Sequence, residues 1–240
     1  MALCVRTVWI LRRYWTNRLG VAVDAFEEPG VTVGPADEGG VQLFRHDESV
    51  VIGAPTALLN SVERESDAAL ELDIDDAGAI REWFDAVGVN GAVLGPAFYG
   101  YTDREVFDPV DGDARALAAG DRPSYDTFRV AIPDDEWEHG GSSLTPGQTV
   151  GLFLGNDLVA VAGYEVWNDL LAHIAVVTHP NHRNSGHGRA VVSLATEQAL
   201  SAGLVPQYRT LEAWPWSVAL ARQLGFERFA TASLGIYNSS

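Results

Sequence analysis

The feature that most constrains the fold is a glycine-bearing loop at residues 183–188, Arg-Asn-Ser-Gly-His-Gly, which separates a strand pattern from a helix pattern. An apolar run at residues 170–177 precedes it and predicts a strand. Residues 189–202 follow with apolar positions at helical spacing, and Gly203 comes where a helix commonly ends. Glycines let the backbone turn sharply, and the first N–H groups of a helix lack internal partners. The loop is therefore predicted to bind an anion such as phosphate.

The strands around this loop predict a mixed sheet. Three apolar runs come before it, and the segments Gly155-Asn156-Asp157 and Asn168-Asp169 separate them. Such residues form tight turns between antiparallel strands, so the runs predict a meander. Residues 205–211 predict one more strand after the helix, which makes a parallel βαβ crossover. The three runs are residues 149–154, 158–166 and 170–177.

The pattern of predicted elements and motifs divides the chain into two regions, residues 1–104 and 105–240. The first region predicts α+β structure without a chemical motif, and its role stays open between dimerisation, substrate capture and a degenerate copy of the second region's fold. Its expected elements are a helix at 9–19, strands at 30–33, 41–44 and 50–52, helices from 55 and over 75–87, and a junction at 95–101. In the second region, the remaining elements are one or two helices within 113–132, a loop at 134–147, a short helix with Ser217 as N-cap, and a strand at 229–237.

The charge of the chain limits its partners. The formal net charge is −17, and all 16 basic residues are arginines. Such a chain repels nucleic acid and anionic lipid, so neither is expected as a partner. No apolar run reaches the roughly 18 residues of a membrane span. Without a secretory signal and with Cys4 as the single cysteine, a cytoplasmic protein is expected, and the excess acid suggests a halophilic, high-salt cytoplasm.

Two segments carry a resemblance to a known family. Residues 178–188 read Thr-His-Pro-Asn-His-Arg-Asn-Ser-Gly-His-Gly, and Leu224-Gly225-Phe226 follows some forty residues later. Over about residues 106–240 the chain resembles the GNAT acetyltransferase superfamily, whose loop reads Arg or Gln, two residues, Gly, one residue, then Gly or Ala. That loop usually follows a strand ending in Val-x-Pro, and here Thr178 stands in place of the valine.

The resemblance implies an α+β fold: a GNAT-like mixed sheet, with an antiparallel meander plus a parallel βαβ crossover, flanked by helices and preceded by a smaller α+β N-terminal region. It also implies acetyl-CoA as co-substrate, with the pyrophosphate on the loop, the pantetheine arm along the preceding strand, and an N–H near Val176 polarising the thioester carbonyl. The implied cofactor-binding residues are Val176, Val177, Thr178, Arg183, Asn184, Ser185, Gly186, His187, Gly188, Arg189 and Ser217.

The usual acid and base of the family are missing from their positions. Ala172 occupies the position of the common glutamate base, and Ala221 that of the common tyrosine acid. Weak substitutes are Glu165, Tyr164 and Glu212. No metal is expected, because the histidines near the loop fit no zinc spacing and lack a cysteine partner.

The expected function is an acetyl-CoA-dependent N-acyltransferase that acetylates a primary amine, of a small molecule or a protein N-terminus, by direct transfer in a ternary complex. The alternative is a non-catalytic acyl-CoA-binding sensor or regulatory domain of the same fold, which the two alanines favour. The acceptor, the acyl-chain length and a homodimer all stay open.

Overall fold

Two compact units make up the chain. The computed structural model describes residues 2–36, 39–74 and 76–238. Unit 1 contains Tyr101–Arg209 and Ala219–Glu227, and unit 2 contains Leu3–Gly100, Thr210–Val218 and the described residues from Arg228 onward. The chain thus leaves unit 1 after residue 209, returns for residues 219–227, and ends in unit 2.

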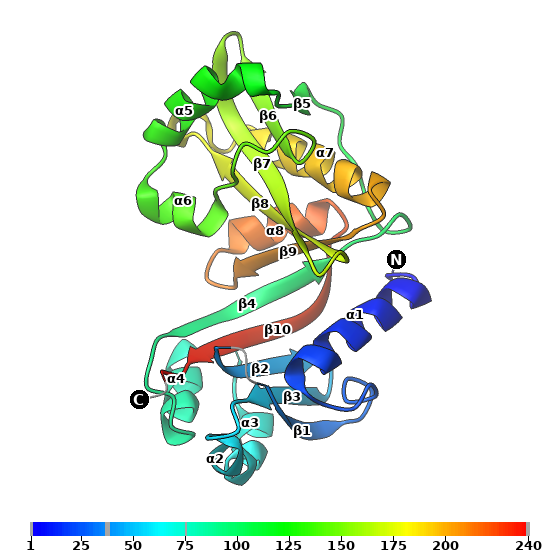
Figure 1. The fold of residues 1–240 in the computed structure, drawn as a ribbon, viewed down its shortest axis with the longest axis vertical. Coiled ribbons are helices and arrows are strands. Elements are labelled where there is room, and N and C mark those ends of the chain that lie inside the picture. Colours follow the sequence, from blue (N-terminus) through cyan, green and yellow to red (C-terminus); the bar gives the residue numbers. More distant parts are fainter. Residues whose placement is uncertain (1, 37–38, 75, 239–240) are drawn as a thin grey trace. The chain divides into compact units, whose positions relative to one another are not determined.

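Unit 1 holds a mixed sheet with the strand order β9-β8-β7-β6-β5 (Figure 1). Strands β6 to β8 form an antiparallel meander, and β8 pairs in parallel with β9. Helix α7 connects β8 to β9, so the predicted meander and βαβ crossover are both confirmed. The strands are β5 (Ala114–Ala116), β6 (Thr149–Leu154), β7 (Asp157–Trp167), β8 (Leu171–Thr178) and β9 (Val205–Leu211).

Three helices pack against this sheet. Helix α7 (His187–Ser201) lies against β7 and β8, α5 (Arg122–Ala131) against β7, and α6 (Asp134–Gly140) against β8. Between α5 and the sheet, Tyr125 and Phe128 are buried in one apolar cluster with Val161 and Val177. This packing fixes α5 and α6 over the same strands that lead into the loop.

Residues 113–140 confirm one prediction and correct another. One α-helix, α5, lies within residues 113–132, as predicted, and the residues before it form β5 and a 3₁₀ turn, η1 (Ala119–Asp121). The predicted loop at residues 134–147 begins as helix α6. Pro133 precedes this helix and its first turn contains Asp134, Asp135 and Glu136, whose negative charges stabilise the positive end of the helix dipole. A proline followed by three acidic residues is a sequence signal for a helix start, and the prediction of a loop overlooked it.

In unit 2 the strands pair in the order β1-β3-β2-β10-β4. Helix α1 packs on β3, while α2 and α3 pack on β1. Asp47 and Glu48 form the tight turn between β2 and β3, as predicted. The elements are α1 (Val5–Leu19), β1 (Gly30–Pro35), β2 (Gly40–His46), β3 (Ser49–Ala54), α2 (Leu59–Arg64), α3 (Ser66–Glu71), α4 (Ala77–Ala86), β4 (Val93–Tyr101) and β10 (Glu227–Ile236).

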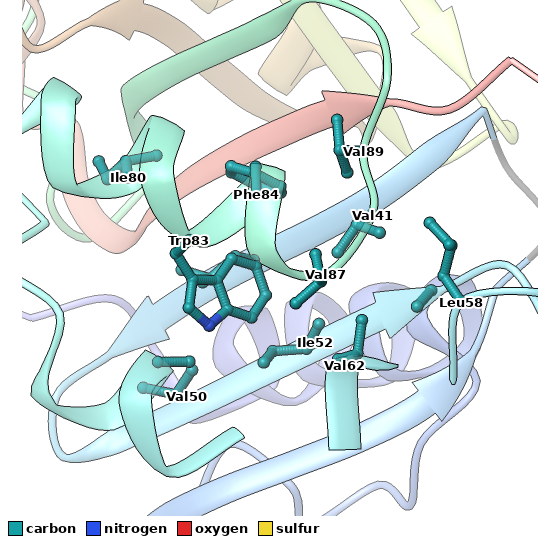
Figure 2. Packing of buried hydrophobic residues seen from close by; sticks show 13 residues of the cluster. Val41, Val50, Ile52, Leu58, Val62, Ile80, Trp83, Phe84, Val87 and Val89 are labelled. Carbon is teal, nitrogen blue, oxygen red and sulfur yellow. The ribbon is translucent and has the colours of Figure 1, made fainter. Parts of the chain in front are cut away.

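The core of unit 2 lies between α4 and its sheet. Trp83 and Phe84 of α4 are buried with Val41 of β2 and Ile52 of β3 (Figure 2). The Trp83 indole also donates a hydrogen bond to the carbonyl of Glu65, 3.0 Å away, which ties α4 to the chain between α2 and α3. The helix predicted over residues 75–87 is thereby confirmed, although Asp75 lies outside the described residues.

Residues 95–101, predicted as a junction, contain the point at which the chain passes from unit 2 to unit 1, between residues 100 and 101. They also belong to strand β4, where Phe98 and Tyr101 are fully buried.

One further prediction is corrected. Ser217 is not an N-cap, because α8 (Pro215–Gln223) begins two residues earlier and the Trp214 carbonyl accepts the Ser217 N–H at 2.9 Å. Proline is well suited to the first turn of a helix, and this explains the earlier start.

Membrane insertion finds no support in the helices. Among residues 2–36, 39–74 and 76–238, no helix combines the length and apolar character needed to cross a bilayer.

Candidate functional site

The glycine loop joins β8 to α7 in unit 1. A short 3₁₀ turn, η2 (Pro180–His182), comes first, and α7 begins at His187. Asn184 and Gly186 both have left-handed backbone, with φ of 61° and 81°. Gly186 is the N-cap residue. Because a glycine has no side chain to cap the helix, the N–H groups of the first turn stay available to an anion.

Gly188 lets this helix start approach the end of β8. A Cβ atom at Gly188 would lie 3.0 Å from Oγ1 of Thr178 and 3.5 Å from Cδ1 of Leu220. A larger residue would push α7 away from both β8 and α8. The structure therefore brings together the loop, the last residues of β8 and the second half of α8.

One edge of β8 is open beside the loop. Its pairing with β9 runs from Leu171–Val205 to Ile174–Tyr208, while β8 itself continues to Thr178. The N–H of His179 bonds to the Val159 carbonyl, toward β7, and backbone groups alternate along a strand. The backbone N–H and C=O groups of residues 176 and 178 must then point toward the β9 side, beyond the last pair of that ladder.

Two arginines flank the loop and both have protein partners. The Nη2 of Arg183 forms an ion pair with Oε2 of Glu136 in α6, and its Nε donates to the Thr178 carbonyl at 3.5 Å. Arg189 donates from Nη1 to Oε1 of Gln223 in α8, at 3.3 Å. Sequence reasoning missed Glu136, since it is 47 residues from Arg183 and lies in a segment predicted as a loop.

The other predicted cofactor residues lie as follows. Val177 is buried and Val176 and Thr178 are half-buried at the end of β8. Ser185 and Asn184 are exposed in the loop, and His187 is half-buried at the first position of α7. Ser217 lies in the first turn of α8, within residues 210–218 of unit 2.

Two of the three catalytic candidates, Tyr164 and Glu165, are successive residues of β7. Glu165 is exposed on β7, directly opposite His173 of β8. Tyr164 is buried on β7, and burial raises the pKa of its hydroxyl. Glu212 belongs to unit 2, where it forms an ion pair with Arg228. Ala172 and Ala221 are both fully buried, so the family's usual acid and base positions are core positions here.

His173 is a buried titratable group beside this strand edge. Its ring stacks on Trp167, with centroids 4.5 Å apart and planes at 24°. The pKa of His173 is lowered from 6.5 to about 4, mainly by burial and also by the charge of Arg209, while a hydrogen bond with Gln207 offsets part of this effect. The imidazole is therefore neutral at pH 7 in the folded protein.

We predict that His173 makes the fold acid-sensitive. Between pH 6.5 and 4 the unfolded chain binds a proton at this residue that the folded chain does not, so the free energy of unfolding falls as pH falls through that window. The loss between pH 7 and pH 5 should be about 2 kcal/mol. Urea unfolding of the wild type and His173→Gln at both pH values measures it. An equal pH dependence in the two proteins would contradict the prediction.

A metal site would need several ligating side chains close together. Among residues 2–36, 39–74 and 76–238, no group of three or more His, Cys, Asp or Glu side chains is arranged to hold an ion.

Comparisons with known proteins bear on the same part of the chain. The model of the acetyltransferase (GNAT) family matches residues 115–226. A curated mycothiol acetyltransferase from Stackebrandtia nassauensis is 31% identical over 96 residues. That match covers 38% of this chain and 30% of the relative's own length.

Solved structures support the fold. A GCN5-related N-acetyltransferase from Kribbella flavida aligns over 96% of both chains, with a TM-score of 0.50 and 17% identity. A GNAT-family protein from Novosphingobium aromaticivorans aligns over 62% of this chain and 66% of its own, with a TM-score of 0.47 and 22% identity. The α+β fold with a mixed sheet is shared with the Kribbella flavida structure. With its loop, crossover and matching family model, the stretch at residues 115–226 belongs to the acetyltransferase (GNAT) family.

Proposed function

We propose that the protein binds acetyl-CoA along the loop and the open edge of β8, and transfers the acetyl group directly to a primary amine of a small molecule or a protein N-terminus. The observation that carries this proposal is the end of the β8–β9 ladder at Ile174–Tyr208, directly before an uncapped helix start. An extended pantetheine arm can bond to the backbone groups of residues 176 and 178, which β9 does not pair, while the pyrophosphate takes the first N–H groups of α7. The proposed binding residues within unit 1 are those predicted from the sequence at residues 176–178 and 183–189.

The chemistry follows from this placement. The amine nitrogen attacks the thioester carbonyl, the carbonyl oxygen gains negative charge, and the C–S bond breaks to release the coenzyme A thiolate. In this proposal the Val176 N–H, which points to the open edge, stabilises that oxygen. The amine proton leaves to a base and the thiolate takes one from an acid or from water.

The acid and base remain proposals. Tyr164 stays protonated because burial raises the pKa of its hydroxyl, as a general acid requires. Glu165 is an exposed carboxylate that could accept the amine proton through water, whereas Glu212 is held by Arg228. Positioning of the two reactants supplies much of the rate if the amine arrives deprotonated.

Thiol release tests the proposal. The protein is mixed with acetyl-CoA and a panel of amines, in dilute buffer and in molar KCl, and free thiol is followed over time. Amine-dependent thiol release supports an acyltransferase. Calorimetric binding of acetyl-CoA without thiol release for any amine supports the sensor alternative. No binding of acetyl-CoA contradicts both.

A further inference from the structure

We infer that α6 is a latch over the open edge of β8, closed by the Glu136–Arg183 ion pair and opened when the phosphates of coenzyme A take Arg183 from Glu136. This inference rests on the proposed function, because it needs a phosphate-bearing ligand at the loop. Binding of coenzyme A at the loop does not itself require the Glu136–Arg183 ion pair.

One face of α6 contacts both ends of the proposed cofactor track, which consists of the loop at residues 183–188 and the open edge of β8. Glu136 and Gly140 are four residues apart in a helix, so they lie on the same face. Glu136 holds Arg183 of the loop, and a Cβ atom at Gly140 would lie only 2.6 Å from the Val176 carbonyl oxygen. The helix therefore spans the distance between the proposed pyrophosphate end and the proposed thioester end of the track.

The Val176 and Thr178 carbonyls on the open edge both have protein neighbours when the Glu136–Arg183 ion pair is formed. The Val176 carbonyl lies against the backbone of Gly140, and the Thr178 carbonyl accepts the Nε of Arg183. Both carbonyls belong to residues whose backbone groups point toward β9, beyond the end of the ladder. A pantetheine arm bound along this edge must displace α6, Arg183 or both.

A phosphate group can compete with Glu136 for the charge of Arg183 and so release α6. The side chains of Arg183 and Glu136 are 43% and 37% exposed, so water screens their attraction and the pair is easily broken. A pyrophosphate offers the guanidinium more charge and more acceptor oxygens than one carboxylate does. Once bound, it also repels the first turn of α6, which carries Asp134, Asp135 and Glu136. Phosphate binding and release of α6 therefore favour each other.

Affinity for coenzyme A tests the latch. Glu136→Gln removes the competing charge at nearly constant volume and should bind coenzyme A about two- to fivefold more tightly than the wild type by calorimetry, the range expected from an exposed ion pair. Glu138→Gln, an exposed position on the same helix, makes the same change in net charge and should bind like the wild type. In an Arg183→Gln background, Glu136→Gln should bring no gain.

Hydrogen exchange gives the second measurement. Coenzyme A should increase amide exchange in residues 134–140 of the wild type, and Glu136→Gln should show that increase without ligand. Equal affinity of Glu136→Gln and the wild type, weaker binding by Glu136→Gln, or an equal gain in both glutamine variants would overturn the latch while wild-type binding of coenzyme A upholds the proposed function. A wild type that binds no coenzyme A overturns both.

Discussion

Glutamate in place of Gly186 should abolish acetyl-CoA binding while the protein stays folded. The residue is the N-cap of α7, and a Cβ atom there would meet no atom within 4 Å, so a longer side chain has room. Its carboxylate would occupy the position proposed for the pyrophosphate and satisfy the same N–H groups. We expect at least a hundredfold loss of affinity, about 2.7 kcal/mol, measured by calorimetry.

Gly186→Gln is the matched control for this change. Both variants strain the left-handed backbone at φ 81° by about 1–2 kcal/mol, so both should unfold at a lower temperature than the wild type. Only the charge differs between them. If the glutamate variant bound acetyl-CoA as tightly as the glutamine variant, the loop would not be the phosphate site.

Proline in place of Val176 should lower kcat about 10²- to 10³-fold, the usual effect of removing one donor to a developing oxyanion. The Val176 N–H points to the open edge, so proline removes the proposed donor without removing a ladder bond to β7. Val176→Ala keeps the N–H and should retain most of the activity. The measurement is steady-state thiol release with saturating acetyl-CoA.

A neighbouring position separates this effect from general disruption of the strand. The Val177 N–H points toward β7, so Val177→Pro breaks the ladder and should lower the melting temperature far more than Val176→Pro does. Wild-type kcat in a folded Val176→Pro variant would show that this N–H does not polarise the thioester.

The sequence predicted the fold best where local chemistry decides structure. The turns at Gly155-Asn156 and Asn168-Asp169 are made of residues that favour tight turns, and the meander was predicted from them. The helix after the loop, with Gly203 at its end, and the strand at Val205–Leu211 were equally well marked. These elements are the ones that position the proposed site.

Prediction failed where tertiary packing decides structure. Strand β4 contains Gly95 and Pro96, which favour loops, yet burial of Phe98 and Tyr101 makes the segment a strand. Helix α6 was missed because its few apolar residues give no periodic pattern. Its stability depends instead on acidic residues at its N-terminus and on contact with β8.

The candidate site shows the same division. The loop residues were predictable from glycine spacing, whereas the open edge depends on where β9 stops pairing with β8. The Glu136–Arg183 ion pair depends on two segments 47 residues apart, which no local pattern reveals. The high-salt cytoplasm inferred from the net charge of −17 stays a prediction.

The most direct test is a crystal structure of the protein with coenzyme A. The account predicts the pyrophosphate within hydrogen-bond distance of the N–H groups of Gly186, His187 and Gly188, and the pantetheine arm alongside Val176 and Thr178 on the β9-facing edge of β8. Coenzyme A bound elsewhere, with β8 and the loop unoccupied, would contradict it.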